Sequence, residues 1–474
     1  MAAPMRLHPD RAFPLDERQR AIAREIYQQT AALPLICMHG HVEAEVLAAN
    51  APFADPAQLL VVPDHYVTRM MVSQGIRPES LGVWRVDGGP VETDSRLIWR
   101  TFCESWKLYR GTPTRYWMEH ELVDVFGVDL VPSAESADAI YDQIAGRIAE
   151  PDFRPQELLE KFSIELIATT DPATSDLRHH ASLAEQGLGK QIIPTFRPDA
   201  VVYLDRPTWR ADIEALAKVS GVDTSGYQGF LTALRERRAA FVAAGALASD
   251  HGHLSADTTP MSATAAAQLY AKALAGPVSQ AEVHAFAAHM LFVMAGMACE
   301  DGLVMQIHPG VLRDHHDGIF HTHGQDKGFD IPVAVEFTRG LRPMLQAYGH
   351  DPRFRVILFT VDESVYSREL APLAGAYPSV RLGAPWWFLD SPEGMRRFRE
   401  SATETAGFYN TSGFVDDTRA FASIPARHDL SRRVDAGFLA RLVMEHRLSQ
   451  SEAVEAAVDL AYNLPKFAYQ RQTP

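Results

Sequence analysis

The sequence predicts an α/β protein: a TIM-like (β/α)8 barrel with a helical insertion after strand one and C-terminal helices. Eight short apolar runs end in polar or aromatic residues, and from residue 160 onward they alternate with longer segments of helical period. This alternation is typical of βα units that build a parallel sheet, whose strand C-termini meet at one active face. The runs are residues 33–41, 164–171, 190–199, 245–251, 302–308, 355–360, 380–387 and 412–417.

The insertion is predicted from the length of chain between the first two runs. About 120 residues separate them, which is too long for a simple βα crossover, and this stretch contains few strand-like runs. Capping boxes mark two helix starts elsewhere, at Ser279 with Glu282 and at Ser449 with Glu452, and the first helix should stop near Gly302. The predicted domains are the N-terminal helix with strand one (1–45), the insertion (46–160), the remainder of the barrel (161–428) and the C-terminal helices (429–474).

Composition excludes several classes of protein. The 474 residues are 46% hydrophobic and 22% charged, which is ordinary for a compact protein and argues against disorder. The net charge of −15, without a Lys/Arg block, makes nucleic acid an unexpected partner. Cys37, Cys103 and Cys299 are too few and too scattered for a disulfide framework. The N-terminus has no apolar signal region and no apolar stretch has the length of a membrane span, so we expect a cytoplasmic protein without a membrane partner.

The most informative motif is His-Gly-His at the end of the first run. Alternate residues of a strand point to one face, so His39 and His41 should project together at the strand's C-terminal end. Asp417 closes the eighth run, which neighbours the first in a closed barrel. Two imidazoles and one carboxylate suit a divalent metal with open coordination positions. Asp417 could instead cap the following helix, and strand alternation should turn the adjacent Asp416 away.

Further polar residues stand at the ends of the predicted strands. His308 and the Asp250-His251 pair could be additional ligands, substrate hydrogen-bond donors or satisfied polar groups of the barrel mouth. The end of the sixth run, 359–362, contains no imidazole, which counts against a two-metal centre. The irregularly spaced histidines of 314–323 fit a solvated loop better than a second metal site.

Cations and aromatic residues could bind a substrate at this mouth. Arg419 could stabilise an oxyanion beside Asp417, or form a surface ion pair. Arg197 and Arg427 are suited to gripping an anion through a guanidinium fork, with ordinary ion pairing as the alternative. The Trp386-Trp387 pair is expected mainly to pack in the core or in the wall of the mouth.

Ten short motifs occur in an order that resembles the uronate (glucuronate) isomerases, a divergent branch of the amidohydrolase superfamily, over residues 10–470. They are HGH at 39–41, PDHYVTRMM at 63–71, TTDP at 169–172, FRPD at 196–199, SDHG at 249–252, MQIHPGVLR at 305–313, DKGFDIP at 326–332, WWF at 386–388, DDTRAF at 416–421 and ARHD at 426–429. The chain departs from the common pattern at Asp171, Val72 and Ala426. These departures concern the preferred sugar more than the reaction.

The resemblance implies a metal-dependent isomerase acting on a small-molecule uronate. It implies that His39, His41 and Asp417 bind a divalent metal, with zinc as the expected ion. It also implies Tyr66, Arg197, Trp386 and Arg419 as active-site residues, with Asp417 and Arg419 nearest the chemistry.

An aldose–ketose isomerase needs a base for the C2 proton, groups that hold the enediol oxygens, and a cation for the remote carboxylate. We expect Asp417 to move the proton and Arg419 and Tyr66 to stabilise a cis-enediol together with the metal. Arg197 and Arg427 compete for the carboxylate, and Trp386, His308 and Asp250 are further candidates for substrate contact. The expected substrates are D-glucuronate and D-galacturonate, giving D-fructuronate and D-tagaturonate. The main alternative is a metal-dependent hydrolase of the same superfamily; whether the protein forms a homo-oligomer is left open.

Overall fold

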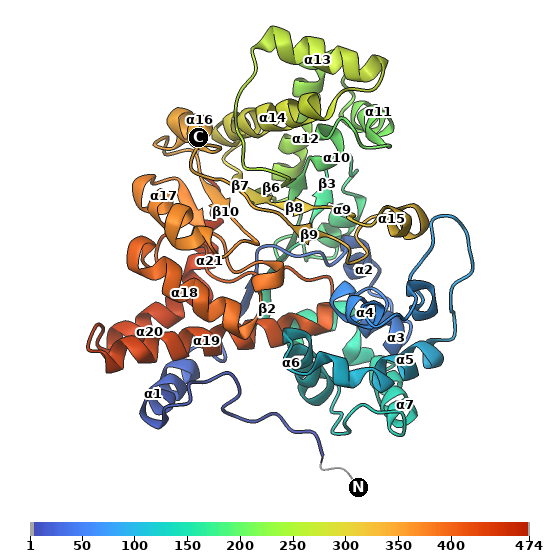
Figure 1. Ribbon diagram of the computed structural model, residues 1–474, viewed down its shortest axis with the longest axis vertical. Helices are drawn as coiled ribbons and strands as arrows, with labels where there is room; N and C mark the ends of the chain where they lie inside the picture. Colours follow the sequence, from blue (N-terminus) through green and yellow to red (C-terminus); the bar gives the residue numbers. More distant parts are fainter. Residues whose placement is uncertain (1–3, 473–474) are drawn as a thin grey trace.

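Eight parallel strand segments form a closed ring in the computed structural model, which describes residues 4–472 (Figure 1). One sheet has the order β1-β2-β4 and another has the order β11-β10-β7-β6-β5-β3. Both belong to one ring, because β3 directly follows β2 along the chain and β5 directly follows β4. Regular strands form the first seven segments of the ring. In chain order these segments are β1 (Leu35–Cys37), β2 (Ile164–Ala168) with β3 (Asp171–Pro172), β4 (Ile192–Ile193) with β5 (Phe196–Arg197), β6 (Ala248–His253), β7 (Val304–Pro309), β10 (Val356–Leu358) and β11 (Val380–Leu382).

Residues 411–418 close the ring between β11 and β1. Thr411 forms a parallel bridge with Leu382. Further along, the Asp417 N–H donates to the His39 carbonyl oxygen at 3.2 Å, and the His41 N–H donates to the Thr418 carbonyl oxygen at 2.9 Å. The predicted barrel and its adjacency of segments eight and one are therefore confirmed. The eighth run forms no regular strand, however, because Gly413 (φ 73°) and Asp417 (φ 41°) interrupt the extended backbone.

Side-chain alternation separates the barrel interior from its outer surface. Val304 packs in the interior cluster, whereas its neighbour Met305 packs among the surrounding helices. Gln306 follows on the inner face, where its Oε1 accepts a hydrogen bond of 2.8 Å from the Tyr469 hydroxyl near the C-terminal end. This period of two places His308, at the end of β7, over the interior on the mouth side.

Between β1 and β2 the chain forms only helices and loops. Trp99, Phe102 and Ile144 are among the side chains that give this region a buried core of its own, which continues onto the outer face of β1 and β2. Figure 1 shows these helices gathered on one side of the barrel. Their bounds are α2 (Ala44–Ala49), α3 (Pro56–Leu60), α4 (His65–Val72), α5 (Ser95–Glu104), α6 (Pro113–His120), α7 (Ala137–Ile148) and α8 (Pro155–Lys161), with short helical turns at Pro78–Leu81, Trp106–Tyr109, Glu121–Val125 and Pro151–Phe153.

The remaining helices cover the barrel and its C-terminal side. Those that follow the second to the seventh strand segments are α9 (Arg178–Glu185), α10 (Asp199–Val202), α11 (Trp209–Ser220), α12 (Tyr227–Ala243), α13 (Ala263–Ala275), α14 (Gln280–Asp301), α16 (Arg342–Tyr348), α17 (Ala371–Ala376) and α18 (Pro392–Ala406), with short helical turns at Tyr366–Leu370 and Trp387–Leu389. The predicted capping box at Ser279 starts α14, and Gly302 (φ 76°) ends it. By length and composition α14 could cross a membrane, but 67% of its apolar window is buried inside the protein.

Helix α19 (Ile424–Met444) follows the eighth segment and packs against α1 (Glu17–Gln28) and α20 (Gln450–Val458). The predicted domain boundary between residues 428 and 429 therefore lies inside α19. The capping box at Ser449 starts α20, and α21 (Leu464–Ala468) ends the helical part of the chain. Short helical turns at Phe421–Ser423 and Asp459–Asn463 complete this region.

An excursion over residues 311–332 leaves the end of β7. Its two short strands, β8 (Val311–Leu312) and β9 (Ile331–Pro332), pair antiparallel, and α15 (Asp317–His323) lies between them. We call these residues the β8–β9 excursion. His323 is buried, with its Nδ1 3.0 Å from the Trp84 carbonyl oxygen, so the excursion contacts the helical insertion. Among the described residues, no histidine of 314–323 belongs to a cluster that could hold a metal.

Candidate active site

His39, His41 and Asp417 converge at the barrel mouth. The Asp417 Oδ1 lies 3.3 Å from the His39 Nε2 and 3.0 Å from the His41 Nε2. Asp417 reaches this position from a left-handed backbone conformation (φ 41°), which is uncommon for a residue with a side chain. Such strain is concentrated at functional sites, where the surrounding structure holds it in place.

A second set of ligating atoms shares His39 with the first. The Asp250 Oδ1 lies 2.7 Å from the His308 Nδ1, and the His308 ring stacks on His39 with 4.6 Å between centroids. Each of the two triads, His39 with His41 and Asp417 and His39 with Asp250 and His308, could hold a metal ion. We call the five residues His39, His41, Asp250, His308 and Asp417 the mouth cluster.

The hydrogen bonding of the mouth cluster fits a bound cation. Buried polar atoms are almost always hydrogen-bonded. Within residues 4–472, five buried atoms lack a hydrogen-bond partner of acceptable geometry although other mouth-cluster atoms lie close by: the His39 Nδ1, the Asp250 Oδ1, both His308 ring nitrogens and the Asp417 Oδ1. Imidazole and carboxylate donors are the set that zinc, manganese and iron accept in proteins.

The electrostatics of the cluster keep its carboxylates ionised. Burial alone would raise the pKa of Asp417, but the imidazoles of His39 and His41 hold it well below its ordinary value. Burial would likewise raise the pKa of Asp250, and Arg197 and His308 lower it well below its ordinary value. Burial lowers the pKa of His41. Burial lowers the pKa of His39 as well, but the Asp250 and Asp417 carboxylates outweigh burial and raise it. Metal binding requires ionised carboxylates and neutral imidazoles, so an ion bound here would displace a proton from His39.

Arg197 and Arg427 lie in different environments. Arg197 bonds to Asp199 at 2.8 Å and to Asp250 at 3.2 Å, and 26% of its side chain is exposed. Arg427 is 1% exposed and donates to the Asp390 Oδ2 at 2.7 Å. Its guanidinium also lies 3.7 Å from the centroid of the Trp117 ring. The Arg427 charge is thus enclosed by protein, whereas Arg197 reaches the mouth.

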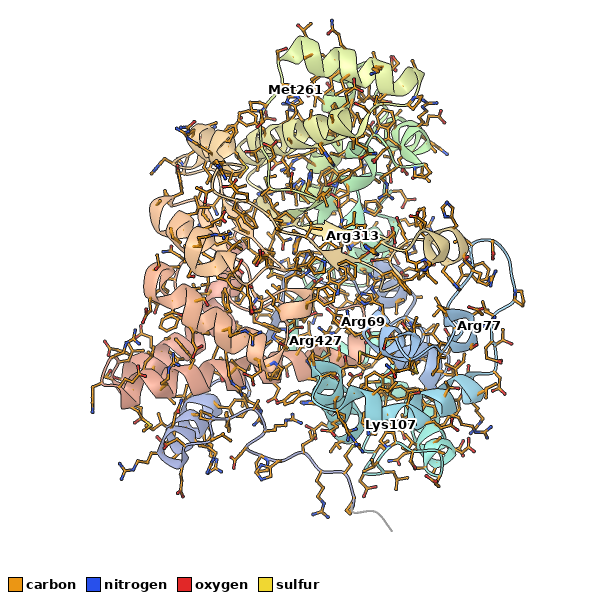
Figure 2. The ribbon with its side chains drawn as sticks, viewed as in Figure 1. Arg69, Arg77, Lys107, Met261, Arg313 and Arg427 are labelled. Carbon is orange, nitrogen blue, oxygen red and sulfur yellow. The ribbon has the colours of Figure 1, made fainter. Side chains whose placement is uncertain are left out.

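Tyr66 comes from α4, which begins where the Asp64 carboxylate accepts the Tyr66 N–H at 2.7 Å. Its ring packs edge-on against Trp117, with the Arg427 guanidinium 5.3 Å from its centroid. Burial raises the pKa of Tyr66 well above its ordinary value, so its hydroxyl keeps its proton at neutral pH. Figure 2 shows the neighbouring α4 residue Arg69 and the α19 residue Arg427 close together in the view.

Arg419 and Trp386 complete the predicted set. The Arg419 Nη2 bonds to the Asp326 Oδ2 of the β8–β9 excursion at 2.7 Å. Trp386 is buried, and its ring meets His308 edge-on at 4.7 Å between centroids. The structure therefore gathers His39, His41, Asp250, His308, Trp386 and Asp417 directly, brings Tyr66 and Arg419 from α4 and the eighth segment, and encloses Arg427 behind them.

Alternation separates two adjacent pairs, Asp250-His251 and Asp416-Asp417, and the sequence predicted this separation for the second pair. His251 turns away from the mouth, and its Nε2 lies 3.0 Å from the Ser249 Oγ. Asp416 points behind the strands, where its Oδ2 lies 3.2 Å from the His428 Nε2. The Cys37 Sγ lies 3.6 Å from that same nitrogen. We call Cys37, Asp416 and His428 the rear cluster; it too could hold a metal.

Two polar residues near the mouth were not predicted. His65 stacks on Tyr66 at 4.9 Å between centroids, and its buried Nδ1 has no hydrogen-bond partner among the described residues. Burial and the nearby Arg419 charge lower the pKa of His65 to about 3, so it is neutral. Asp326 is the second, through its bond to Arg419. Both belong to motifs recognised in the sequence, and the charged side chain in DKGFDIP was the available signal for Asp326.

Comparison with known proteins gives a consistent family. The model of the glucuronate isomerase family matches residues 10–468. A uronate isomerase of Rhizobium meliloti is 53% identical over 98% of this chain and 99% of its own length. The crystal structure of a glucuronate isomerase from Caulobacter crescentus superposes with a TM-score of 0.96 at 49% identity, covering 98% of this chain and 97% of that one. A uronate isomerase structure from Thermotoga maritima gives 0.91 at 29% identity, covering 98% and 100%. The chain belongs to the glucuronate isomerase family.

Proposed function

We propose that this protein interconverts D-glucuronate and D-fructuronate, and D-galacturonate and D-tagaturonate, by proton transfer through a cis-enediol. The observation that carries the proposal is the convergence of Asp417 with His39 and His41 at the barrel mouth, in a chain of this family. The mouth supplies a carboxylate base, a neutral phenol and a guanidinium, which are the groups that this isomerisation needs.

Asp417 is the proposed base. Its ionised carboxylate takes the proton from C2 of the open-chain aldehyde, and the C2–H electron pair forms the C1–C2 double bond of the enediol. The C1 oxygen takes up negative charge in this step. In the second half, the proton of the C2 hydroxyl moves to the C1 oxygen as C2 becomes the ketone, and Asp417 returns its proton to C1.

Tyr66 and Arg419 are proposed to stabilise the oxygens on C1 and C2 of the sugar. The Tyr66 hydroxyl, which keeps its proton, donates to the C1 oxygen, and the Arg419 guanidinium stabilises negative charge as it develops on the enediol. Trp386 and His308 form part of the wall beside them. Donors that are fixed before reaction in this way stabilise the transition state more than the bound sugar.

We propose zinc as the metal, held by His39, His41 and Asp417. The unpaired buried atoms of His39 and Asp417, and the mixed imidazole and carboxylate donors of the three residues, support this choice. When bound, the ion supplies positive charge that favours an anionic sugar and a developing oxyanion.

Arg197 is the proposed anchor for the substrate carboxylate, in preference to Arg427. Its side chain is partly exposed at the mouth, and a guanidinium still has donors free after bonding to two aspartates. Arg427 is enclosed and paired with Asp390, so binding a second carboxylate there would require displacing that pair.

The test incubates metal-loaded protein with each uronate and follows the ketouronate signals by NMR. Appearance of ketouronate without nicotinamide or nucleotide is the expected result. If both uronates remain unchanged while members of an amide, ester or lactone panel are cleaved, the protein is a hydrolase. Arg197→Lys should raise KM for both uronates more than it lowers kcat, because it removes a bidentate contact made in the bound and transition states alike.

A reducing, cytoplasmic location is also proposed. The three cysteines are free and buried, and none lies in a disulfide. Fractionation of the producing cells, with activity measured in each fraction, tests it.

A further inference from the structure

The β8–β9 excursion contributes a carboxylate to the mouth that the proposed reaction does not use. The Asp326 Oδ2 accepts a hydrogen bond of 2.7 Å from the Arg419 Nη2. The two side chains remain 40% and 36% exposed, so they meet at the rim and not in the sealed interior. An ordinary rim ion pair would contribute little, because water screens it. This pair differs from an ordinary rim ion pair because further hydrogen bonds hold the backbone of Asp326 in place.

Asp326 is fixed by a chain of bonds through the excursion. Its N–H donates to the Asp314 Oδ1 at 3.1 Å, and the Asp314 N–H donates to the Asp330 Oδ1 at 2.6 Å. Asp330 is 2% exposed, and its other oxygen accepts from the Arg313 Nη1 at 2.9 Å. The backbone that carries Asp326 is therefore tied at a buried carboxylate four residues away.

The same segment lies directly on α4, which carries Tyr66. Gly328 has φ 84°, and a Cβ built there would come within 3.2 Å of the His65 Cβ and 3.4 Å of the Arg69 Cβ. On the far side, the Arg313 guanidinium lies 5.2 Å from the centroid of the Trp387 ring. Glycine at 328 thus permits a close approach that a side chain would oppose. The excursion therefore connects Arg419 of the eighth segment to α4, the helix that carries Tyr66.

We propose that Asp326 is a positioning residue for the isomerisation: it holds the Arg419 guanidinium in the orientation that meets the enediol oxygens. A guanidinium has five N–H donors, and the bond to Asp326 uses one, leaving the others for substrate. A flexible arginine must otherwise lose side-chain freedom when the enediol forms. This inference rests on the role proposed above for Arg419.

The first test measures kcat and KM for D-glucuronate in Asp326→Asn, which keeps the shape and removes the charge. We expect kcat to fall about 10-fold, with KM changing less than about 3-fold, because fixed orientation acts mainly in the transition state. Asp317→Asn is the matched control: Asp317 is an exposed carboxylate of the same excursion with no ion-pair partner among the described residues. Asp326→Ser provides a second variant if Asp326→Asn does not fold.

The second test asks whether an external carboxylate replaces the lost one. Formate added to Asp326→Ala should recover part of the lost kcat, and it should not increase kcat in the wild type or in Asp317→Asn. A purely structural role for Asp326 predicts no recovery. Wild-type kcat in both Asp326→Asn and Asp326→Ser overturns the inference, as does loss of kcat that formate leaves unchanged.

Arg419→Lys tests the proposed role of Arg419 separately from the positioning role of Asp326. Wild-type activity in Arg419→Lys would remove Arg419 from the reaction. A large loss in Arg419→Lys together with wild-type kcat in Asp326→Asn would leave the role of Arg419 intact and overturn only the positioning role. If Arg419 and Asp326 both act as proposed, Asp326→Asn should cost little further activity in the Arg419→Lys background, because the effects of mutating residues that act as a unit do not add.

Discussion

The mouth cluster and the rear cluster both draw residues from the first and eighth barrel segments and contain similar residue types, yet their environments differ. Asp417 and Asp416 are adjacent in sequence, and each faces imidazole: Asp417 faces His39 and His41, and Asp416 faces His428. In the mouth, the Asp417 Oδ1 has no hydrogen-bond partner of acceptable geometry in the described part of the chain. Behind the strands, Asp416 and His428 are hydrogen-bonded to each other and leave no unpaired side-chain atom.

The difference teaches that ligating residue types within reach of one another do not by themselves make a metal centre. The rear cluster is enclosed between the barrel and α19, and burial raises the pKa of Cys37 well above its ordinary value, so the thiol stays protonated. A protonated thiol is a poor metal ligand, because binding needs the thiolate. The mouth cluster combines ionised carboxylates with unpaired donors, so it should determine activity and metal content, whereas the rear cluster should determine stability.

The largest expected contrast is between the two aspartates. Asp417→Asn keeps the side-chain shape but removes the base, so kcat with saturating metal should fall by about 10²-fold or more. In D₂O, the variant should lose isomerisation and solvent-deuterium incorporation at C1 together. Asp416→Asn should leave kcat within a few-fold of wild type and lower the free energy of unfolding by about 1–3 kcal/mol, since it weakens a buried hydrogen bond. Near-normal turnover by metal-loaded Asp417→Asn would place the base elsewhere, with Tyr66 as the next candidate.

The histidines should separate the clusters by metal content. His39→Ala or His41→Ala removes one of the three proposed metal ligands. Purified protein should therefore contain much less metal by elemental analysis while keeping its circular dichroism spectrum. His428→Ala is the matched control from the rear cluster and should retain wild-type metal. Wild-type metal content in both His39→Ala and His41→Ala would remove the pair from the site, and loss of metal in His428→Ala would give the rear cluster a ligand role.

The last contrast, which should change stability and leave activity and metal binding at a given pH unaffected, concerns the buried carboxyl of Glu121 behind the mouth. Burial, reinforced by Asp64, raises the pKa of Glu121 to about 8 in the folded protein, although Arg427 opposes the shift. The folded state therefore holds this proton more tightly than the unfolded state, whose Glu pKa is about 4.3. The stabilising contribution is complete below the unfolded pKa and is lost as pH rises toward 8, with a slope of at most about 1.4 kcal/mol per pH unit.

Urea unfolding of wild type and Glu121→Gln between pH 5 and 8 measures this slope. The neutral amide cannot ionise, so the stability of the variant relative to wild type should increase with pH. Parallel pH profiles for the two proteins would show that Glu121 does not titrate with folding. At each pH, the metal content of Glu121→Gln should equal that of wild type, since Glu121 lies outside the mouth cluster.

Local patterns in the sequence determined much of the barrel and the centre of the site. Apolar runs of strand length predicted the strand segments, because strand alternation is a local rule. A closed barrel makes its first and last segments neighbours, and this placed Asp417 beside the histidine pair. The capping boxes at Ser279 and Ser449 start helices as predicted, since their hydrogen bonds span only three residues. The ordered motifs predicted the family, and the family model that matches residues 10–468 confirms it.

The tertiary structure decided what those local rules do not contain. Gly413 and Asp417 take left-handed backbone conformations that leave the eighth segment without a regular strand, although its apolar run predicts one. Arg197 and Arg427 are each the second residue of a short motif, FRPD and ARHD, and only packing encloses Arg427 against Trp117 while leaving Arg197 at the mouth. Tyr66, His65 and Asp326 reach the site from an insertion and an excursion. Their positions depend on contacts between segments that are distant in sequence, such as Asp326 with Arg419 at a separation of 93 residues, and no sequence periodicity specifies those contacts.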